Sequence, residues 1–169
     1  LPPAARAVVG DRAQAAGPGG PARAESPPPQ PQRRRRGPLT PVLEGPEPAF
    51  VSRGGLKLHH ALNTFGLDVT GFVCADLGCS TGGFTDCLLR HGAARVHSVD
   101  TAYGELAWKL RQDPRVVVHE RSNALHFEPA EPADLVVIDL GWTPQRLALP
   151  AAARWLKPGG RIVSLVKPH

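Results

Sequence analysis

The feature that most constrains the fold is an alternation, from residue 49 onward, of short continuously apolar segments with segments of helical periodicity. The apolar segments lack the every-second-residue polar pattern of a half-exposed strand, which indicates a parallel sheet covered on both faces. The sequence therefore predicts an α/β fold. Its five expected strands lie roughly at 73–77, 95–99, 115–119, 134–140 and 161–167.

Apolar residues spaced three and four apart predict helices between these strands. Gly66 and Gly92 are expected to end the first two helices, and Pro158-Gly159-Gly160 the last. The stripes are Leu58, Ala61, Leu62 and Phe65; Phe84, Cys87 and Leu88; Tyr103, Leu106, Ala107 and Leu110; and Ala148, Ala152, Trp155 and Leu156.

Residues 1–48 differ in composition from the rest of the chain. They hold 12 of the 19 prolines, 6 of the 18 glycines and seven arginines against four acids. Such a segment cannot bury enough apolar surface to offset the entropy of ordering its backbone. We predict a disordered Pro/Arg-rich arm at 1–48 and one domain at 49–169. The run Arg33 to Arg36 is either a nonspecific phosphate-binding element or a solvated basic run.

Compartment and metal content are predicted from what the sequence lacks. No apolar run approaches the roughly 20 residues of a membrane-spanning helix, and the first residues do not resemble a secretory signal. The three cysteines, Cys74, Cys79 and Cys87, have neither disulfide-framework nor zinc-site spacing. We therefore expect buried thiols in the cytoplasm, no membrane span and no metal.

A glycine-rich turn follows the first predicted strand, at Asp76-Leu77-Gly78-Cys79-Ser80-Thr81-Gly82-Gly83-Phe84. Its glycines let the backbone turn tightly and approach a ligand, and the next helix points its first N–H groups at that ligand. Asp100 ends the second strand 22 residues after Gly78. An acid there can accept from both ribose hydroxyls of a nucleoside.

Other interpretations of this turn stay open. It does not match the G-x-G-x-x-G pattern, which argues against a dinucleotide-binding site. Gly78, Ser80 and Gly82 match the G-x-S-x-G nucleophile elbow of hydrolases, with Asp139 and His169 as formal triad partners. However, that elbow normally follows several strands, and this turn follows the first. A glycine-rich turn that binds no ligand is the third interpretation.

Five motifs in order resemble the TlyA-type (haemolysin-like) ribosomal RNA 2′-O-methyltransferases, which are related to the FtsJ-like RNA methyltransferases. The resemblance covers about residues 50 to 169. The motifs are Val51-Ser52-Arg53-Gly54-Gly55-Leu56-Lys57-Leu58, Asp76 to Asp86, Asp100, Leu135-Val136-Val137-Ile138-Asp139, and Leu165-Val166-Lys167-Pro168.

The resemblance implies a Rossmann-like fold and an S-adenosylmethionine (SAM) site. Asp100 matches the family's ribose-binding acid, and Asn123 falls where the family contacts the adenine. An asparagine amide can both donate to and accept from a base edge. The residues that match the first cofactor loop are Asp76, Gly78, Ser80, Thr81, Gly82 and Phe84.

The resemblance also implies catalytic residues, because the family uses a Lys-Asp-Lys-Glu set. Lys57, Asp139 and Lys167 match its first three members. A ribose 2′-hydroxyl must lose or share its proton as it attacks the methyl group. Lys167 would orient the hydroxyl or act as the base, and Asp139 would hold both ammonium groups in place. We expect the three side chains to converge at the carboxyl edge of the sheet.

The resemblance implies an RNA substrate, and the sequence lacks the patterns of two other classes of methyltransferase. Asp139-Leu140-Gly141-Trp142-Thr143-Pro144 does not match the pattern of base-amino methyltransferases, and the cysteines lie too early for carbon methylation. A non-catalytic RNA-binding or haemolysin-like protein and a small-molecule O-methyltransferase remain alternatives. The sequence does not predict an oligomeric state.

The chain departs from the family at both ends. The arm shows no S4-type RNA-binding pattern, and five strands replace the family's seven, so that the catalytic glutamate is missing. Position 1 is not methionine. We therefore expect a fragment truncated at its C-terminus and inactive by itself, with Arg161 to Lys167 at an edge of the sheet.

Overall fold

The computed structural model describes residues 49–167. The predicted arm at 1–48, with Arg33 to Arg36, lies outside the described residues, and so does His169. The elements, in chain order, are α1 (Gly54–Thr64), β1 (Val73–Leu77), α2 (Gly83–Arg90), β2 (Arg95–Val99), α3 (Trp108–Arg111), β3 (Val116–His119), β4 (Ala133–Ile138), α4 (Gln145–Ala153) and β5 (Leu156–Ser164).

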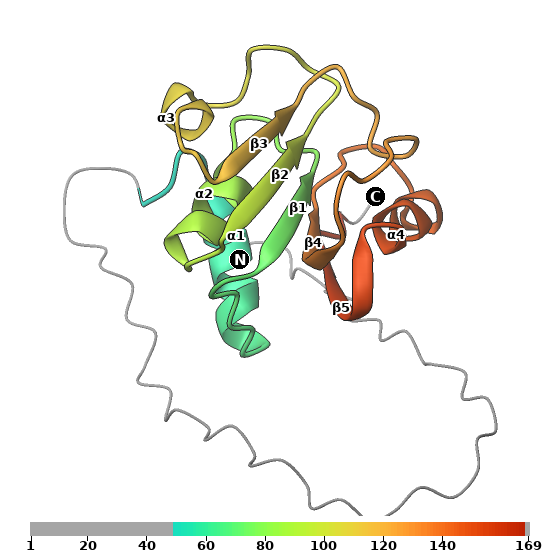
Figure 1. Cartoon of the computed structure of the whole chain (residues 1–169), viewed down its shortest axis with the longest axis horizontal. Coiled ribbons are helices and arrows are strands. Elements are labelled where there is room, and N and C mark those ends of the chain that lie inside the picture. Colours follow the sequence, from blue (N-terminus) through green and yellow to red (C-terminus); the bar gives the residue numbers. More distant parts are fainter. Residues whose placement is uncertain (1–48, 168–169) are drawn as a thin grey trace, which may run out of the picture.

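The five strands form one sheet in the order β3-β2-β1-β4-β5, with every pair parallel, which confirms the predicted α/β architecture (Figure 1). The chain moves outward from β1 to β3 and then returns to the other side of β1 with β4. This reversal creates a crevice beyond the carboxyl ends of β1 and β4, where open α/β sheets bind their ligands. As expected, the strand that contains Arg161 lies at an edge.

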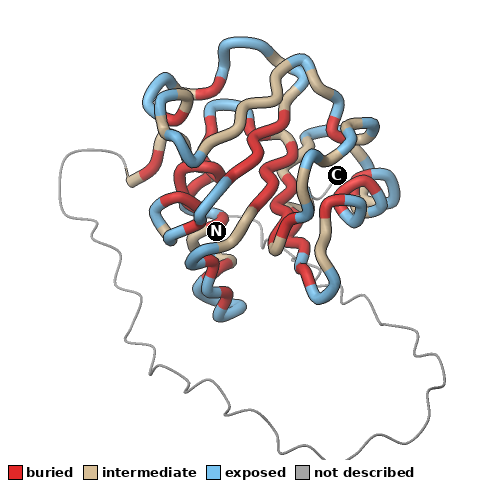
Figure 2. The backbone as a smooth tube through the Cα atoms, in the orientation of Figure 1, coloured by how far each residue is buried: buried red, intermediate tan, exposed pale blue. Residues whose placement is uncertain are grey.

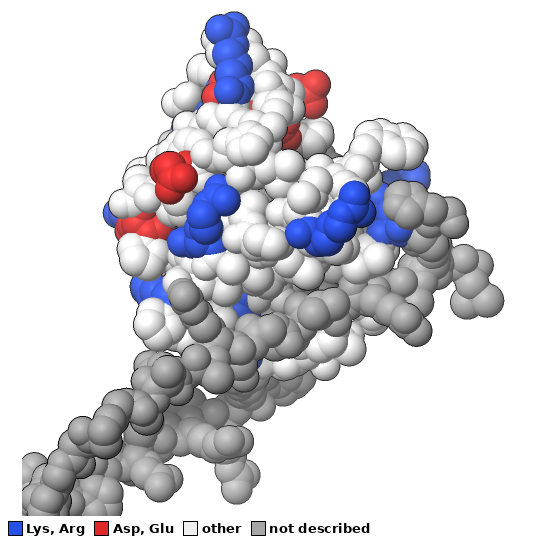
Figure 3. Space-filling view, turned by 90° about the vertical axis from the view of Figure 1, so that its right-hand side faces the viewer, with Lys and Arg blue, Asp and Glu red and all other residues white. Residues whose placement is uncertain are grey.

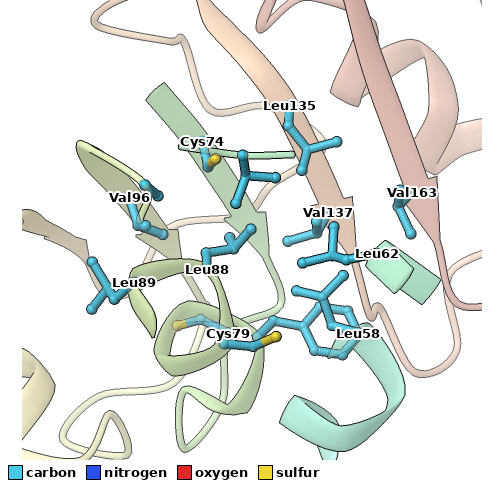
Figure 4. Close-up of a cluster of buried hydrophobic side chains, with 14 of the residues drawn as sticks. Leu58, Leu62, Cys74, Cys79, Leu88, Leu89, Val96, Leu135, Val137 and Val163 are labelled. Atoms are coloured by element: carbon cyan, nitrogen blue, oxygen red, sulfur yellow. The ribbon is translucent and has the colours of Figure 1, made fainter. Parts of the chain in front are cut away.

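One face of the sheet packs against α1 and α2. Alternate strand residues point to this side, where they meet Leu58 and Leu62 of α1 and Leu88 of α2 (Figure 4). These three leucines are almost fully buried. The strand residues on this face are Cys74, Val96, Leu135, Val137 and Val163.

The other face packs against α4. Ala148 and Ala152 of this helix and Trp155, which follows it, are fully buried against the intervening strand positions. Because both faces are covered, the central strands are buried along their length (Figure 2), which explains their continuous apolar sequence. The strand residues on this face are Ala75, Leu77, Val99, Val136, Ile138 and Ile162.

The last helix and strand differ from the prediction. The helix ends at Ala153, and β5 begins at Leu156, before the Pro158-Gly159-Gly160 turn that was expected to end the helix. The cause is pairing with β4. Leu156 pairs with Ala133, and a register shift between Ala133 and Leu135 accommodates the turn residues inside the strand. β5 ends at Ser164, so Lys167 lies beyond the strand.

The third predicted helix is shorter than expected. It begins at Trp108, and Tyr103 lies outside it with 69% of its surface exposed. The N–H of Ala107 donates to Thr81 O over 3.0 Å, which fixes the helix start beneath the glycine-rich turn. Leu106 and Leu110 are buried there, so their spacing reflects packing against that turn. In the described part of the chain, no helix is long and apolar enough to cross a membrane.

Candidate active site at the carboxyl edge of the sheet

The turn after β1 has a backbone that only a few residue types adopt. Gly78 and Gly82 have φ angles of +86° and +102°, and Ser80 has φ +48°. The N–H of Gly78 donates to Val99 O over 2.9 Å, which holds the turn against the end of β2. A Cβ at Gly78 would lie 2.7 Å from Asp139 O, so any side chain there would collide with the chain leaving β4.

The start of α2 packs closely against the start of α1. A Cβ at Gly83 would lie 2.2 Å from Ser52 Oγ and 2.8 Å from the backbone nitrogen of Gly55. The N–H of Val51 also donates to Asp86 Oδ2 over 2.9 Å. The segment before α1, including Ser52, therefore has a packing role that the sequence alone did not reveal.

Asp100 is half-buried at the end of β2, and both of its carboxylate oxygens accept backbone N–H groups. Ser80 N donates to Oδ2 over 2.8 Å and Ala102 N donates to Oδ1 over 2.9 Å. These bonds fix the orientation of the carboxylate. Each oxygen retains a lone pair for a further donor.

A cavity, called here the edge cavity, opens beside the carboxyl ends of β1, β2 and β4. Its volume is about 370 Å³, which lies within the range of about 300–1,000 Å³ typical of small-molecule sites. Five of the predicted site residues share it: Gly78, Ser80, Asp100, Asn123 and Asp139. The other wall residues are Val99, Thr101, Ser122, Ala124, Leu125, Leu140, Gly141, Trp142 and Thr143.

Asn123 reaches the wall of the edge cavity through a local turn. Its Oδ1 accepts the N–H of Leu125 over 2.9 Å. Asn123 O also accepts the N–H groups of His126 and Phe127, over 3.0 and 2.9 Å. These bonds fix the position of the residue, and its exposed side chain keeps a free amide group for a ligand.

The remaining predicted cofactor residues do not line the edge cavity. Phe84 is buried in the core. Thr81 is exposed, and its carbonyl accepts the Ala107 N–H. At Gly82, a Cβ would lie 2.4 Å from Leu110 Cδ1. These residues shape the turn and its support, and their role toward a cofactor stays a prediction.

Asp76 is fully buried behind the turn. Thr85 Oγ1 donates to its Oδ2 over 2.7 Å, whereas its Oδ1 has no hydrogen-bond partner among the described residues. Burial, the largest cause, raises the pKa of Asp76 to about 7 together with the nearby charges of Asp139 and Asp100, against the opposing hydrogen bonds from Thr85. Three carboxyl groups thus gather at this end of the sheet.

The concentration of carboxyl groups distinguishes between ligand classes. A dinucleotide would bring the negative charge of a pyrophosphate toward Asp76, Asp100 and Asp139. A ligand with positive charge would instead be attracted. For the hydrolase interpretation, Ser80 does have a positive φ angle, but among residues 49–167 no histidine lines the edge cavity, and His169 lies outside the described residues. The site fits a cationic nucleoside best.

Asp139 and Lys167 form an ion pair at the rim of the site. Lys167 Nζ lies 2.8 Å from Asp139 Oδ1, and the two side chains are 45% and 25% exposed. Asp139 is the first residue after β4, and its N–H donates to Leu77 O. The N–H of Leu165 donates to Ile138 O, which keeps the segment leading to Lys167 beside β4.

Lys57 occupies a different place. It is exposed on α1 and borders a shallow groove of about 60 Å³ that also includes Phe84, Ser164 and Leu165. We call this the α1 groove. Among the described residues, Lys57 forms no ion pair with Asp139, whereas Lys167 does. The structure thus brings two of the three predicted catalytic residues together, Asp139 and Lys167. The third, Lys57, lies apart on α1.

Several residues of the cavity wall were not predicted from the sequence as site residues, notably Thr101, Ser122 and Trp142. Trp142 is 92% exposed, although it is a large apolar residue beside a cavity. Its position three residues after a strand-ending acid was the available signal. Ser122 is placed by its N–H, which donates to Asp100 O over 2.9 Å.

Comparison with known proteins agrees with the geometry. Over 131 residues the chain is 48% identical to the 16S/23S rRNA (cytidine-2′-O)-methyltransferase TlyA of Mycobacterium tuberculosis, and this match covers 76% of the chain and 49% of that protein. Over 136 residues it is 46% identical to YqxC of Bacillus subtilis, an rRNA methyltransferase candidate, with 78% and 48% covered. The chain therefore spans about half the length of these relatives.

Solved structures show the same relationship. A hemolysin candidate from Streptococcus thermophilus superimposes with a TM-score of 0.69 at 44% identity, which covers 73% of this chain and 46% of that one. The sequence pattern of FtsJ-like methyltransferases matches residues 50–169. On the strength of this match and of the sheet order, the chain belongs to the FtsJ-like methyltransferase family.

Proposed function

We propose that this protein transfers a methyl group from S-adenosylmethionine to a ribose 2′-hydroxyl of RNA, with ribosomal RNA as the substrate. The observation that carries this proposal is the Asp139–Lys167 ion pair, which stands at the rim of a nucleoside-sized cavity with acidic walls. The names of the relatives support the rRNA substrate. Such a substrate implies a cytoplasmic location.

The residues present fit this cofactor. SAM has a sulfonium and an ammonium group, and the carboxylates of Asp100 and Asp139 favour positive charge nearby. A positive charge there would also favour the ionised form of Asp76, whose pKa is about 7 without it. Asp100 would accept from the ribose hydroxyls, and Asn123 would bond to the adenine edge. The other proposed contributors are the turn residues Gly78, Ser80, Thr81 and Gly82, with Phe84 supporting the turn from the core.

When bound, the cofactor supplies an electrophilic methyl group, so the protein's main task is to position the acceptor. Lys167 Nζ would orient the 2′-hydroxyl by donating to its oxygen. To take up the hydroxyl proton, Nζ would first have to release the proton that it carries in the ion pair, and Asp139 Oδ1, 2.8 Å away, would then stabilise the ammonium ion that re-forms. Lys57, beside Ser164 and Leu165 in the α1 groove, would border the incoming RNA.

Charge and aromatic exposure support an RNA substrate. The chain has a formal net charge of +5, and Lys and Arg outnumber Asp and Glu on the face shown in Figure 3. Positive charge attracts the phosphate backbone without sequence preference. The exposed ring of Trp142 beside the edge cavity offers a stacking surface for an unpaired base.

The direct test is methyl transfer to ribosomal RNA that lacks the modification. The purified product of the whole gene, with the 169-residue chain assayed beside it as the form expected to be inactive, would be incubated with tritiated SAM and rRNA from cells without the gene, followed by mass spectrometry of the nucleosides. We expect a 2′-O-methylnucleoside with the wild-type protein and none with Lys167→Met. A base-methylated product, or methyl transfer to small hydroxylated molecules without RNA, would contradict the proposal. SAM binding without any transfer would support the non-catalytic alternative.

A further inference from the structure

A second cluster of chemically active side chains lies between α1 and α2, apart from the edge cavity. His59 of α1 faces His91, the residue that caps the end of α2, and His59 Nδ1 lies 2.8 Å from His91 Nε2. The thiol of Cys87 completes the group. One ligand atom from each of the three residues lies within 4.8 Å of the others.

Two features hold these three side chains close together in the folded chain. Cys87 and His91 are four residues apart at the end of α2, so their side chains share one face of the helix turn. His59 comes from α1, which packs against α2 through the core that contains Leu58, Leu62 and Leu88. The ligand atoms are therefore held by two elements whose relative position the core already fixes.

The geometry points to a metal ion: we propose that His59, Cys87 and His91 bind Zn²⁺ or a similar borderline divalent cation, with water as the fourth ligand. Imidazole nitrogen and thiolate sulfur are the ligands that such cations prefer. In tetrahedral coordination at about 2.0–2.1 Å, two imidazole nitrogens lie about 3.3–3.4 Å apart. The histidine pair has to open by about 0.5 Å, a small movement for rings that are only partly buried.

Asn63 lies one helix turn from His59 on α1, and its Nδ2 is 3.0 Å from His59 Nε2. As placed, the amide donates to Nε2. If Nδ1 binds the metal, Nε2 bears the hydrogen, and the amide has to turn over so that its oxygen accepts. Metal-bound histidines commonly have such a partner, which fixes the ring and its tautomer. Without a metal, the same contacts make a hydrogen-bonded histidine pair above a buried thiol, and this is the competing explanation.

A metal here would have a consequence for the proposed active site. Lys57 lies two residues before His59 in α1, and α2 begins at the glycine-rich turn that borders the edge cavity. An ion bound by both helices would therefore clamp the Lys57-bearing helix to that turn. Such binding would stabilise the folded chain, and the stabilisation would grow with the logarithm of the free ion concentration once that concentration exceeds Kd.

The test is a titration of the reduced, tag-free and metal-free full chain with Co²⁺, followed by displacement with Zn²⁺. We expect one ion per chain, a thiolate-to-cobalt charge-transfer absorption, and a higher melting temperature on Zn²⁺ addition. Cys87→Ala should abolish the charge-transfer band, and His91→Ala should weaken Co²⁺ binding by more than about 100-fold. Asn63→Ala should weaken binding by about 10- to 100-fold, the range for a group behind a metal ligand.

Matched variants separate the site from general effects on folding. Cys74→Ala removes another fully buried thiol, and His60→Ala removes an exposed histidine next to His59. Both should keep the charge-transfer band and the affinity. The proposal is overturned if no ion binds at micromolar concentration, if the bound ion shows no thiolate band, or if binding survives Cys87→Ala and His91→Ala unchanged.

Discussion

The backbone N–H of Ser80 donates a 2.8 Å hydrogen bond to Asp100 Oδ2, which ties the turn after β1 to the end of β2. The two segments that would hold the cofactor therefore depend on each other for their positions. Ser80 has a positive φ angle, a conformation that costs energy for a residue with a side chain. This hydrogen bond helps to hold it there.

Substitution at Asp100 should weaken SAM binding. Asp100→Asn keeps an oxygen for the Ser80 N–H, but it turns its NH2 toward the Ala102 N–H and loses the charge-assisted bonds to the ribose, worth about 1.5–3 kcal/mol. We expect a roughly ten- to hundredfold loss of affinity by calorimetry, together with a lower melting temperature from the lost Ala102 hydrogen bond. Asp113→Asn, which alters a carboxylate paired with Arg115 away from the cavity, is the control. Equal affinity in both variants would remove Asp100 from the cofactor site.

Lys167 and Lys157 make a matched pair for testing catalysis. Each forms an ion pair with an aspartate at a similar distance, Lys167 with Asp139 at 2.8 Å and Lys157 with Asp134 at 3.0 Å. Lys167→Met should lower methyl transfer by about 10²- to 10⁴-fold, the usual contribution of a proton-transfer group. SAM affinity should be kept.

Lys157→Met should leave the transfer rate unchanged, because Lys157 pairs with Asp134 near the start of β4, whereas Asp139, the partner of Lys167, lines the edge cavity. The two variants should lose similarly little stability, since partly exposed ion pairs contribute about 0–1 kcal/mol. A comparable loss of rate in both variants would show that general charge, rather than the Asp139–Lys167 pair, supports the reaction.

The strands and the glycine-rich turn could be predicted because their signals are local. A mostly apolar run such as 73–77 indicates a buried element, and its boundaries agree with β1. Gly78 and Gly82 follow directly, and both need the positive φ angles that glycine allows. The proximity of Asp139 and Lys167 could also be predicted, because the carboxyl ends of neighbouring parallel strands meet at one edge of the sheet.

The remaining features depend on contacts that are distant in sequence. The start of β5 was misplaced because a register shift against Ala133, and not the local Pro158-Gly159-Gly160 signal, decides where pairing begins. Leu106 and Leu110 have helical spacing but pack beneath Gly82. The His59–His91 contact joins residues 32 positions apart on two helices, and no periodicity in one segment predicts such a contact.

Trp142 should contribute to RNA binding rather than to cofactor binding. Its ring is 92% exposed at the edge cavity, and stacking on a base is worth about 1–3 kcal/mol. Trp142→Ala should raise KM for RNA by about 5- to 150-fold without changing SAM affinity. Trp108→Ala removes another exposed tryptophan, 74% exposed on α3, and should have no such effect. An unchanged KM in Trp142→Ala would exclude the stacking role.

Asp76 should make the protein less stable at alkaline pH. Its pKa is raised to about 7 by burial first, then by neighbouring charges, whereas in the unfolded chain it is close to 3.8. The folded state therefore retains a proton that the unfolded state releases, and stability falls as pH rises from about 4 through about 7. The difference amounts to at most about 4 kcal/mol above pH 7.

Urea unfolding at pH 5 and pH 8 measures this effect. Asp76→Asn, which cannot ionise, should lose most of the difference in unfolding free energy between the two pH values. Glu128→Gln, at an exposed position, should keep the wild-type difference. A wild-type pH dependence in Asp76→Asn would assign the effect to other groups.

Gly78 should tolerate alanine far less well than Gly71, although both have positive φ angles, +86° and +75°. At Gly71 an added Cβ meets nothing within 4 Å, so Gly71→Ala costs only the left-handed conformation, about 1–2 kcal/mol. At Gly78 the Cβ would lie 2.7 Å from Asp139 O, and relieving that overlap should cost about 1–3 kcal/mol more. The same shift would displace Asp139 from Lys167. We therefore expect Gly78→Ala to lower both the unfolding free energy, measured in urea, and the rate of methyl transfer. Gly71→Ala should lower the unfolding free energy alone. Equal effects in the two variants would mean that the chain after β4 moves away from the added Cβ without loss of stability.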